Sequence, residues 1–222
     1  MAEGLMPGQW RLGIDEAGRG CVLGPLVICG FAVERENLPL LELLSLKDSK
    51  ALSPAKRERL AVELRNIPGR IFLMKVRPSI VDAAVSRQGL NTLEIAGMVR
   101  LIRRINPGSV FIDALTSNPG RFGDQISGLI APLTTKVVAE NRADSKFPIV
   151  MAASILAKVA RDAVIAGLRR RYGDIGSGYP GDPKTRKFLG GYSISGDYPH
   201  CVRRSWSTLE NIRRQALNPV EA

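Results

Sequence analysis

The chain has 222 residues, of which 45% are hydrophobic, so it can bury one sizeable core. No apolar run approaches the roughly 18 residues that cross a bilayer, and the first ten residues lack the basic start and apolar stretch of a signal peptide. We therefore expect no membrane span and a cytoplasmic location. The 32 Lys and Arg residues against 21 Asp and Glu give a net charge of +11, which is consistent with nucleic acid as a partner but does not establish it.

The cysteine and histidine content argues against several kinds of site. Cys21, Cys29 and Cys201 are odd in number and have no CxxC spacing, which speaks against a disulfide framework and against a zinc site. We expect buried, reduced thiols. His200 is the single histidine and no GxSxG turn is present, so a Ser-His-Asp or Cys-His site has little support. We expect His200 to be a structural or surface residue.

The first half of the chain predicts three strands with one helix between them. The strands are expected at residues 11–15, 22–33 and 70–76. In the first, Leu12 and Ile14 alternate with Gly13 and Asp15, which is the period of a strand with one buried face. The helix begins cleanly, because Ser53 can cap it with Pro54 in the first helical position, and it ends before Pro68.

The second half predicts alternating helices and strands. A helix opens at Asn91 and carries Glu94 three residues later, the spacing of a capping box. Arginines on this helix are equally consistent with a solvated face and with phosphate contact. Further elements are expected as strands at 109–113 and 134–139, helices at 122–130 and 148–171, a loop at 173–183 and a polar tail at 203–214. A meander followed by strand, helix and strand indicates an α/β domain with a mixed sheet, which the tail would extend as a helix.

Acidic residues stand where the predicted strands leave the core. Asp15 and Glu16 end the first strand, Asp113 ends the fourth, and Asp144 follows the fifth. Any one of them could be an ordinary turn or cap residue. If the first and fourth strands are neighbours, however, Asp15 and Asp113 lie side by side, with the other two close enough to share a cation.

Such a cluster requires a counter-ion. Like charges about 5 Å apart repel by roughly 3 kcal/mol per pair at an effective dielectric constant of about 20. Ligation by carboxylate oxygens alone favours hard ions, Mg²⁺ first and Mn²⁺ as a substitute, whereas zinc prefers histidine or cysteine. A basic protein with an acidic metal site suits phosphodiester hydrolysis. A basic binding module without catalysis would explain the charge, but not four acids at strand ends.

One run of residues is far more specific than these patterns. The segment Gly13-Ile14-Asp15-Glu16-Ala17-Gly18-Arg19-Gly20 closely resembles the opening motif of the type 2 ribonucleases H. Further blocks resemble that family in the same order, at residues 47–50, 111–114, 143–144, 152–162, 176–183 and 202–206. The resemblance spans about residues 13 to 208, and the residues of the motifs are more similar to the archaeal and eukaryotic branch than to the bacterial one.

The resemblance implies a ribonuclease H-like fold: a five-stranded mixed sheet flanked by helices, with a C-terminal helical extension. Residues 1–172 would form the catalytic core, and residues 173–222 a substrate-binding loop and helical extension of the same domain. The implied activity is endonucleolytic hydrolysis of the RNA strand of RNA/DNA hybrids and incision 5′ of single ribonucleotides embedded in duplex DNA. The products would carry 5′-phosphate and 3′-hydroxyl ends.

By the same resemblance, Asp15, Glu16, Asp113 and Asp144 would be catalytic and would hold two Mg²⁺ ions, with Mn²⁺ as an alternative. One ion would activate the attacking water and the other would stabilise the leaving 3′ oxygen. Substrate contacts are implied for eight further residues: Gly18, Arg19, Gly20, Ser49, Lys50, Tyr179, Arg203 and Arg204.

These eight residues divide into groups with different expected tasks. Gly18, Arg19 and Gly20 would recognise the ribose 2′-hydroxyl, because glycine lets the backbone approach a sugar edge, although a tight turn needs glycine as well. Tyr179 would stack on the sugar beyond the ribonucleotide, or else simply pack. Ser49 and Lys50 would hold a phosphate, and Arg203 and Arg204 would contact the duplex farther away, unless these side chains are only solvated.

The chain departs from the family pattern at two positions. Cys21 replaces the proline that usually follows the glycine-arginine-glycine run, and Arg142 stands where lysine is common. The chain also ends in ALNPVEA without a clamp-binding motif, so recruitment by a replication clamp is unsupported, and we expect a monomer. The nearest rival is a type 3 ribonuclease H, but that form usually carries an N-terminal substrate-binding domain, and only fourteen residues precede Asp15.

Overall fold

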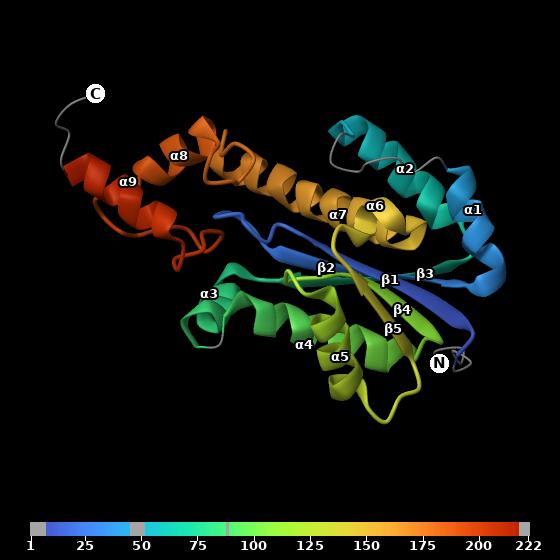
Figure 1. The fold of residues 1–222 in the computed structure, drawn as a ribbon. Helices are drawn as coiled ribbons and strands as arrows, with labels where there is room; N and C mark the ends of the chain where they lie inside the picture. Colours follow the sequence, from blue (N-terminus) through green and yellow to red (C-terminus); the bar gives the residue numbers. More distant parts are fainter. Residues whose placement is uncertain (1–7, 45–51, 88, 218–222) are drawn as a thin grey trace. The chain divides into compact units, whose positions relative to one another are not determined.

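The computed structural model describes residues 8–44, 52–87 and 89–217 (Figure 1). In chain order the elements are β1 (Trp10–Ala17), β2 (Leu26–Glu34), a 3-10 turn (Arg35–Asn37), α1 (Leu38–Leu43), α2 (Pro54–Asn66), β3 (Gly69–Val76), α3 (Pro78–Arg87), α4 (Leu90–Ile105), β4 (Ser109–Asp113), α5 (Pro119–Ile130), β5 (Lys136–Glu140), α6 (Ala143–Lys146), α7 (Pro148–Tyr172), α8 (Pro183–Gly190) and α9 (Ser207–Leu217). No helix of the described part of the chain is long and apolar enough to cross a membrane.

Contacts along the chain define two compact units, each interrupted in sequence. The first unit comprises the described residues of 1–17, 28–74 and 91–159, and the second those of 18–27, 75–90 and 160–222. The predicted division into residues 1–172 and 173–222 of one domain stays a prediction.

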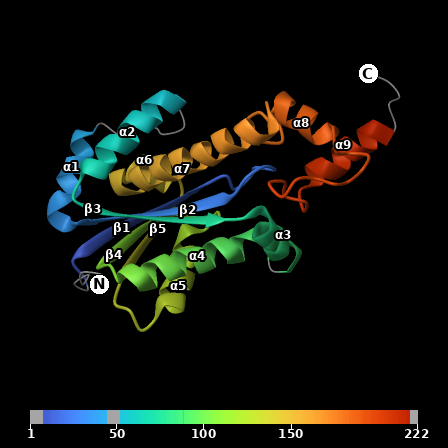
Figure 2. The same cartoon turned by 180° about the vertical axis from the view of Figure 1, so that it is seen from behind.

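The first unit is built on a five-stranded mixed sheet in the order β3-β2-β1-β4-β5. Strand β4 lies between β1 and β5 and is parallel to both. Helices α1, α2 and α6 and the first turns of α7 cover one face, and α4 and α5 cover the other (Figures 1 and 2). The α/β class, the mixed five-stranded sheet and the flanking helices predicted from the sequence are therefore confirmed.

Strand β1 has a buried apolar face and packs closely against the start of α7. Leu12 and Ile14 are fully buried, as their alternation predicts. Between them, Gly13 lets the start of α7 approach the sheet: a Cβ at this position would lie 2.3 Å from the carbonyl oxygen of Ile149. Any side chain at Gly13 would therefore push α7 away from β1, whose last residues carry the acidic pair.

The second unit has a hydrophobic core of its own and contains the helical C-terminal part of the chain. Its core is made by buried residues of the segment after β1, the second half of α7, helices α8 and α9, and the loops on either side of α8: Val22, Leu23, Ile165, Ile175, Leu189, Cys201, Val202, Leu209 and Ile212. Leu23 and Val202 form an antiparallel bridge, and α8 contacts α9. Core residues that are distant in sequence thus hold the loops of this unit in place.

Several elements differ from the sequence prediction. Helices α1, α3, α6 and α8 were not predicted, and α4 begins one residue before Asn91. Strand β2 starts only at Leu26, because the apolar residues before it bond a distant loop and not the sheet. The backbone N–H groups of Val22 and Leu23 both donate to the carbonyl of Gly178. Ser53 caps α2 as predicted, accepting a hydrogen bond from the backbone N–H of Lys56 at 3.3 Å. All three cysteines are free, and their burial agrees with the sequence prediction.

Candidate functional site

Two of the predicted catalytic acids end adjacent strands of the first unit. In the parallel pairing of β1 with β4, Ile14 stands opposite Ile112, so Asp15 and Asp113 follow at neighbouring positions. Burial raises the pKa of Asp15, and the charge of Asp113 adds to this rise. The prediction that the first and fourth strands are neighbours is therefore confirmed, and with it the side-by-side position of these two acids.

Asp15 is a buried carboxyl group with 6% of its surface exposed. Its Oδ1 accepts the backbone N–H of Glu16 at 2.8 Å, and it also hydrogen-bonds the Ser154 side chain. The Lys158 ammonium donates to Ser154 Oγ at 2.9 Å, one helical turn along α7. Burial, reinforced by the charge of Asp113, outweighs these contacts and raises the Asp15 pKa from 3.8 to about 6. The negative charge of Asp15 is therefore unfavourable in the folded protein, and a bound cation would stabilise it.

Asp113 also positions the segment that carries the fourth acid. Its Oδ1 accepts the backbone N–H of Ala143 at 2.9 Å, at the first residue of α6. Asp144 is the next residue and is buried. Arg142, just before α6, has a left-handed backbone with φ of 57°, and nothing in the structure distinguishes this arginine from the lysine common in the family. The link to Asp113 ties the short α6 to the end of β4.

The described residues hold no group of three or more His, Cys, Asp or Glu side chains already arranged to bind a metal ion. Glu16 is partly exposed at the end of β1, next to Asp15. The chemistry of the four side chains fits a divalent cation, because all are carboxylates and at least Asp15 carries an unfavourable negative charge. The joint metal site of Asp15, Glu16, Asp113 and Asp144 stays a prediction.

The strain on Asp15 leads to a testable stability effect. Because the folded-state pKa of about 6 exceeds the ordinary 3.8, the folded protein binds this proton more tightly than the unfolded chain. Stability from this group is therefore greatest below about pH 4 and falls as the pH rises to about 6. In EDTA at pH 8, Asp15→Asn is expected to raise the free energy of unfolding by about 1–3 kcal/mol.

Urea denaturation monitored by circular dichroism measures this effect. The gain should shrink as the pH is lowered from about 6 to about 4. Asp124→Asn, which changes an exposed acid on α5, is the matched control and should show no such gain. Equal stability of wild type and Asp15→Asn at pH 8 would show that the buried carboxylate is not strained.

The second unit contains the glycine-arginine-glycine turn. Gly18 has a φ of +85°, and the backbone N–H of Cys21 donates to its carbonyl at 3.3 Å, which closes the turn over residues 18–21. A Cβ at Gly18 would lie 2.7 Å from the Pro25 carbonyl oxygen and 2.8 Å from Cδ of Arg161. Glycine is therefore required at position 18 both by conformation and by space. At Gly20, by contrast, a Cβ would meet no atom within 4 Å.

Arg203 holds this turn from inside the protein. Its guanidinium donates to three backbone carbonyls, those of Gly18 at 2.7 Å, Arg19 at 2.9 Å and Gly24 at 3.1 Å. The side chain is fully buried and stacks over the Trp206 ring, 4.8 Å from its centroid. A direct contact with the duplex, as the sequence suggested, would require the guanidinium to leave these carbonyls. The structure shows Arg203 as a buried support of the turn, and its contact with the duplex stays a prediction.

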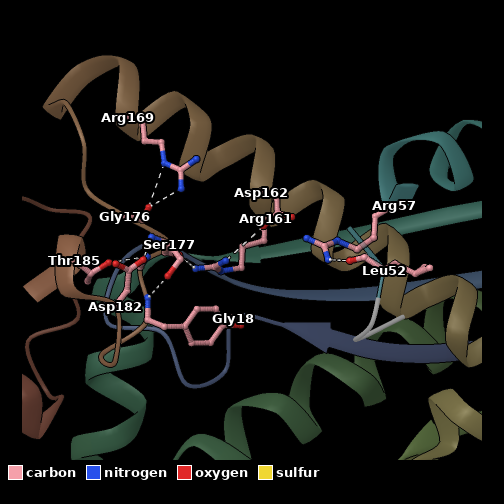
Figure 3. Close-up of polar contacts among 12 residues, drawn as sticks. Gly18, Leu52, Arg57, Arg161, Asp162, Arg169, Gly176, Ser177, Asp182 and Thr185 are labelled. Carbon is pink, nitrogen blue, oxygen red and sulfur yellow. Dashed lines mark hydrogen bonds and ion pairs between the residues drawn. The ribbon is translucent and has the colours of Figure 1, made fainter. Parts of the chain in front are cut away.

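A second buried arginine, Arg161 on α7, joins the turn to the loop that carries Tyr179. Its Nη2 donates to the Ser177 carbonyl at 2.8 Å (Figure 3). Its guanidinium lies over the Tyr179 ring, 5.0 Å from the centroid. The same side chain packs against Gly18. Sequence reasoning assigned Arg161 no task, although the family-like block at residues 152–162 that contains it was a signal.

The loop before α8 is braced by its own hydrogen bonds. The backbone N–H of Ser177 donates to Oδ2 of Asp182 at 2.6 Å, and that of Gly178 donates to the Thr185 hydroxyl at 2.9 Å (Figure 3). The Arg169 guanidinium donates to the Gly176 carbonyl at 2.9 Å. The loop therefore presents Tyr179 from a fixed backbone, and this side chain is still 46% exposed, so its ring can stack on a ligand.

The remaining predicted substrate contacts lie on the surface or outside the described residues. Arg204 is exposed; its backbone N–H donates to Oδ2 of Asp82 at 2.9 Å, and its guanidinium donates to the Tyr198 carbonyl at 3.0 Å. Arg19 is partly exposed on the turn. Ser49 and Lys50 lie outside the described residues. Direct contact of the eight predicted residues with substrate stays a prediction.

A mixed five-stranded sheet, helices on both faces and acids ending its adjacent central strands define a protein of the ribonuclease H type. A solved structure agrees with this class. Bst ribonuclease HIII in complex with Mn²⁺ has a TM-score of 0.75, covering 95% of this chain and 71% of its own chain. At 18% identity, this similarity shows the fold alone. The chain belongs to the ribonuclease HII family, whose pattern it matches over residues 12–209.

Relatives within that family are much more similar. Ribonuclease HII of Thermococcus onnurineus is 45% identical, covering 94% of this chain and 92% of the relative. The structure of ribonuclease H2 from Pyrococcus horikoshii has a TM-score of 0.85 at 38% identity, covering 94% and 99% of the two chains. A structure of the PCNA:RNase HII complex from Archaeoglobus fulgidus has a TM-score of 0.84 at 40% identity, covering 91% and 96%. The chain is therefore a nuclease with ribonuclease H activity on RNA paired with DNA.

Proposed function

We propose that this protein is a metal-dependent endonuclease that hydrolyses the RNA strand of RNA/DNA hybrids and incises 5′ of single ribonucleotides embedded in duplex DNA. The products carry 5′-phosphate and 3′-hydroxyl ends. One observation carries this proposal: the acidic pair and the glycine-arginine-glycine turn are almost adjacent in the chain. Asp15 and Glu16 lie at the end of β1, and the Gly18-Arg19-Gly20 turn follows after one residue. Cleavage and sugar recognition are therefore encoded side by side.

The four carboxylates Asp15, Glu16, Asp113 and Asp144 would hold two Mg²⁺ ions, or Mn²⁺ in their place. When bound, such ions lower the pKa of a coordinated water and stabilise charge on the attacking and leaving oxygens of a phosphodiester. The chain's own contribution is to hold these acids on the rigid ends of β1 and β4 and, through the bond from Ala143 to Asp113, at the start of α6. The raised pKa of Asp15 supports this assignment, because a nearby cation would relieve it.

The turn at residues 18–20 would recognise the ribose, with Arg203 as the group that fixes its shape. Gly20 is exposed and has open space where a side chain would be, so a sugar edge can approach the backbone there. Arg203 keeps the neighbouring carbonyls in place through three hydrogen bonds. A preformed turn loses less conformational freedom on binding than a mobile one would.

The decisive experiment offers three labelled duplexes in Mg²⁺ or Mn²⁺: all DNA, DNA with one ribonucleotide, and an RNA/DNA hybrid. We expect cleavage of both ribose-containing duplexes, with the single cut 5′ of the ribonucleotide, and no cleavage of the all-DNA duplex. Chelation by EDTA should stop cleavage. Cutting of the all-DNA duplex, or cleavage that continues in EDTA, would contradict the proposal. A duplex that is bound but never cut in either metal would indicate a binding module instead.

Tyr179 is expected to decide how well the enzyme acts on a single ribonucleotide. Stacking on an aromatic ring contributes about 1–3 kcal/mol for a nucleic-acid base, so loss of a comparable contact corresponds to a roughly 5- to 150-fold loss in kcat/KM. Tyr179→Ala should lower kcat/KM by about tenfold or more on the single-ribonucleotide duplex and by clearly less on the hybrid. Tyr179→Phe, which keeps the ring, is the matched control. Steady-state kinetics on both substrates tests this, and equal losses on the two would refute the assigned role.

Two expectations about partners remain proposals. The protein is expected to act as a monomer, which analytical ultracentrifugation checks. The absence of a clamp-binding motif concerns a C-terminus whose last residues, 218–222, lie outside the described residues. Because the similar Archaeoglobus fulgidus structure contains PCNA with its ribonuclease HII, a direct binding assay with an archaeal clamp is the relevant test.

A further inference from the structure

The hydroxyl of Thr185 holds the loop that carries Tyr179 from outside that loop. Thr185 lies in the first turn of α8 and is fully buried. Its Oγ1 accepts the backbone N–H of Gly178 at 2.9 Å and donates to the Ile175 carbonyl at 2.8 Å. The hydroxyl gives its single proton to Ile175 and offers a lone pair to Gly178, so both partners are satisfied at once. One side chain therefore fixes two points of the backbone just before Tyr179.

The start of α8 also holds the backbone on the other side of Tyr179. The N–H of Asp182 donates to the Tyr179 carbonyl at 3.1 Å. The Asp182 carboxylate in turn accepts the N–H of Ser177 at 2.6 Å (Figure 3). As the cap of α8, it also accepts the N–H of Lys184 at 2.9 Å. The tyrosine thus lies between backbone groups that are bonded, on both sides, to the beginning of one helix.

Gly178 connects this loop to the residues that follow the glycine-arginine-glycine turn. Its carbonyl accepts the N–H groups of Val22 and Leu23 at 2.9 and 3.1 Å, while its own N–H is bonded to Thr185. The fit is close, because a Cβ at Gly178 would lie 3.1 Å from the Leu23 carbonyl oxygen. All of these residues belong to the second unit. Gly178 therefore sets where the loop stands relative to the turn, and Thr185 holds Gly178 in that place.

Removal of the Thr185 hydroxyl would release the loop at one defined point. The N–H of Gly178 is buried, and a buried donor without an acceptor is unfavourable. The loop would shift to find another acceptor, and Tyr179 would move with it because it is the next residue. A hybrid offers a ribonucleotide at every position, so an enzyme with a displaced ring can still cut in some register. A duplex with one ribonucleotide offers a single register, so its cleavage depends more strongly on where the ring stands.

We propose that Thr185 is a specificity-determining positioning residue, whose hydroxyl places the Tyr179 ring and so sets the preference for a single embedded ribonucleotide over an RNA/DNA hybrid. This inference rests on the proposed role of Tyr179 in substrate recognition. Thr185 is buried and does not touch the substrate. It acts through the backbone of Gly178, and the ring of Tyr179 makes the contact with the sugar.

The test measures kcat/KM on the single-ribonucleotide duplex and on the hybrid. Thr185→Val keeps the size and the branched Cβ but removes both hydrogen bonds. It should lower kcat/KM on the single-ribonucleotide duplex by about 5- to 20-fold while changing the hybrid by less than about threefold. Thr185→Ser keeps the hydroxyl and should stay within about twofold of wild type on both substrates. In a Tyr179→Ala background, Thr185→Val should cause no further loss of preference, because the ring that it positions is absent.

Thr135→Val is the matched control. The Thr135 hydroxyl is also buried and donates to the Pro107 carbonyl at 2.7 Å, but this residue belongs to the first unit. Its loss should lower the free energy of unfolding without changing the preference between the two substrates. If Thr185→Val does not fold, Thr185→Cys takes its place, because a thiol bonds weakly and should give a smaller loss of the same selectivity.

Hydrogen exchange followed by mass spectrometry supplies a readout that is independent of activity. A peptide covering residues 173–182 should exchange faster in Thr185→Val than in the wild type, and Thr185→Ser should restore the slow exchange. The same peptide should be unchanged in Thr135→Val. Unchanged exchange in Thr185→Val would show that the hydroxyl does not hold the loop.

Equal losses on both substrates, an equal loss of preference in Thr135→Val, or a further selective loss in the Tyr179→Ala background would overturn the inference. The proposed function fails separately. If Tyr179→Ala has no selective effect, the role of the tyrosine itself is wrong. If Tyr179→Ala is selective but Thr185→Val is not, only the role of Thr185 is wrong.

Discussion

Asp113→Asn should abolish cleavage of both ribose-containing duplexes, lowering kcat by about 10³-fold or more, while duplex affinity stays within a few-fold of wild type. The change removes a negative charge from the proposed metal site. It also keeps an oxygen at Oδ1, which can still accept the N–H of Ala143 and hold the start of α6. The loss should therefore report on charge and not on the position of Asp144.

The measurement combines single-turnover cleavage in Mg²⁺ with fluorescence anisotropy of a labelled duplex in EDTA. Asp124→Asn, at an exposed position of α5, controls for the loss of any one negative charge and should cleave as wild type. Asp113→Ala is the informative comparison, because it also removes the acceptor for Ala143 and should cost stability as well as activity. Weakened binding with intact catalysis at high enzyme concentration would contradict a metal-binding role for Asp113.

Arg203→Lys should lower the free energy of unfolding by about 2–4 kcal/mol, the second large effect that we expect. The guanidinium serves three carbonyls at once from a fully buried position, and its pKa is lowered by burial only to about 10, so it remains charged at neutral pH. A lysine ammonium lacks the planar fork that reaches all three acceptors. At least one of the three carbonyls, two of which belong to the turn at residues 18–20, would lose its partner.

Arg204→Lys is the matched control, because the neighbouring arginine is exposed and bonds a single carbonyl, that of Tyr198. Its effect on the free energy of unfolding is expected to stay below about 0.5 kcal/mol. Urea denaturation of the two variants and the wild type measures both changes. If the two lysine variants were equally stable, Arg203 would not be a buried support of the turn. Cleavage by the Arg203→Lys protein under conditions where it remains folded shows whether the turn also loses ribose recognition.

The parts of the fold that follow from local patterns were predicted well. The alternation in β1 placed Leu12 and Ile14 in the core, and Ser53 with Pro54 marked the start of α2, because both features depend on residues within one strand or one helical turn. Helices α1, α3, α6 and α8 were missed: none has more than ten residues, and α3 has only two buried residues, so their apolar pattern is weak.

Contacts across long stretches of sequence could not be predicted in the same way. Arg203 belongs to a tail that reads as a basic surface, yet it bonds Gly18, 185 residues earlier. Asp82 accepts the backbone N–H groups of Arg204 and Ser205, more than 120 residues away, and no pattern around Asp82 indicates this. Which carbonyl a buried guanidinium reaches depends on how the chain is packed, and burial reverses the expectation that an arginine faces solvent.

The acidic pair at the end of β1 and the glycine-arginine-glycine turn after it were determined by the sequence alone, together with the family and the mixed sheet. These features are contiguous in the chain or repeat with the period of a strand. They can therefore be recognised without knowing the tertiary structure. Only the tertiary structure decided that Asp15 and Asp113 end neighbouring strands, and that Arg203 and Arg161 are buried supports of the loops. Those contacts join residues that come together only when the hydrophobic cores form.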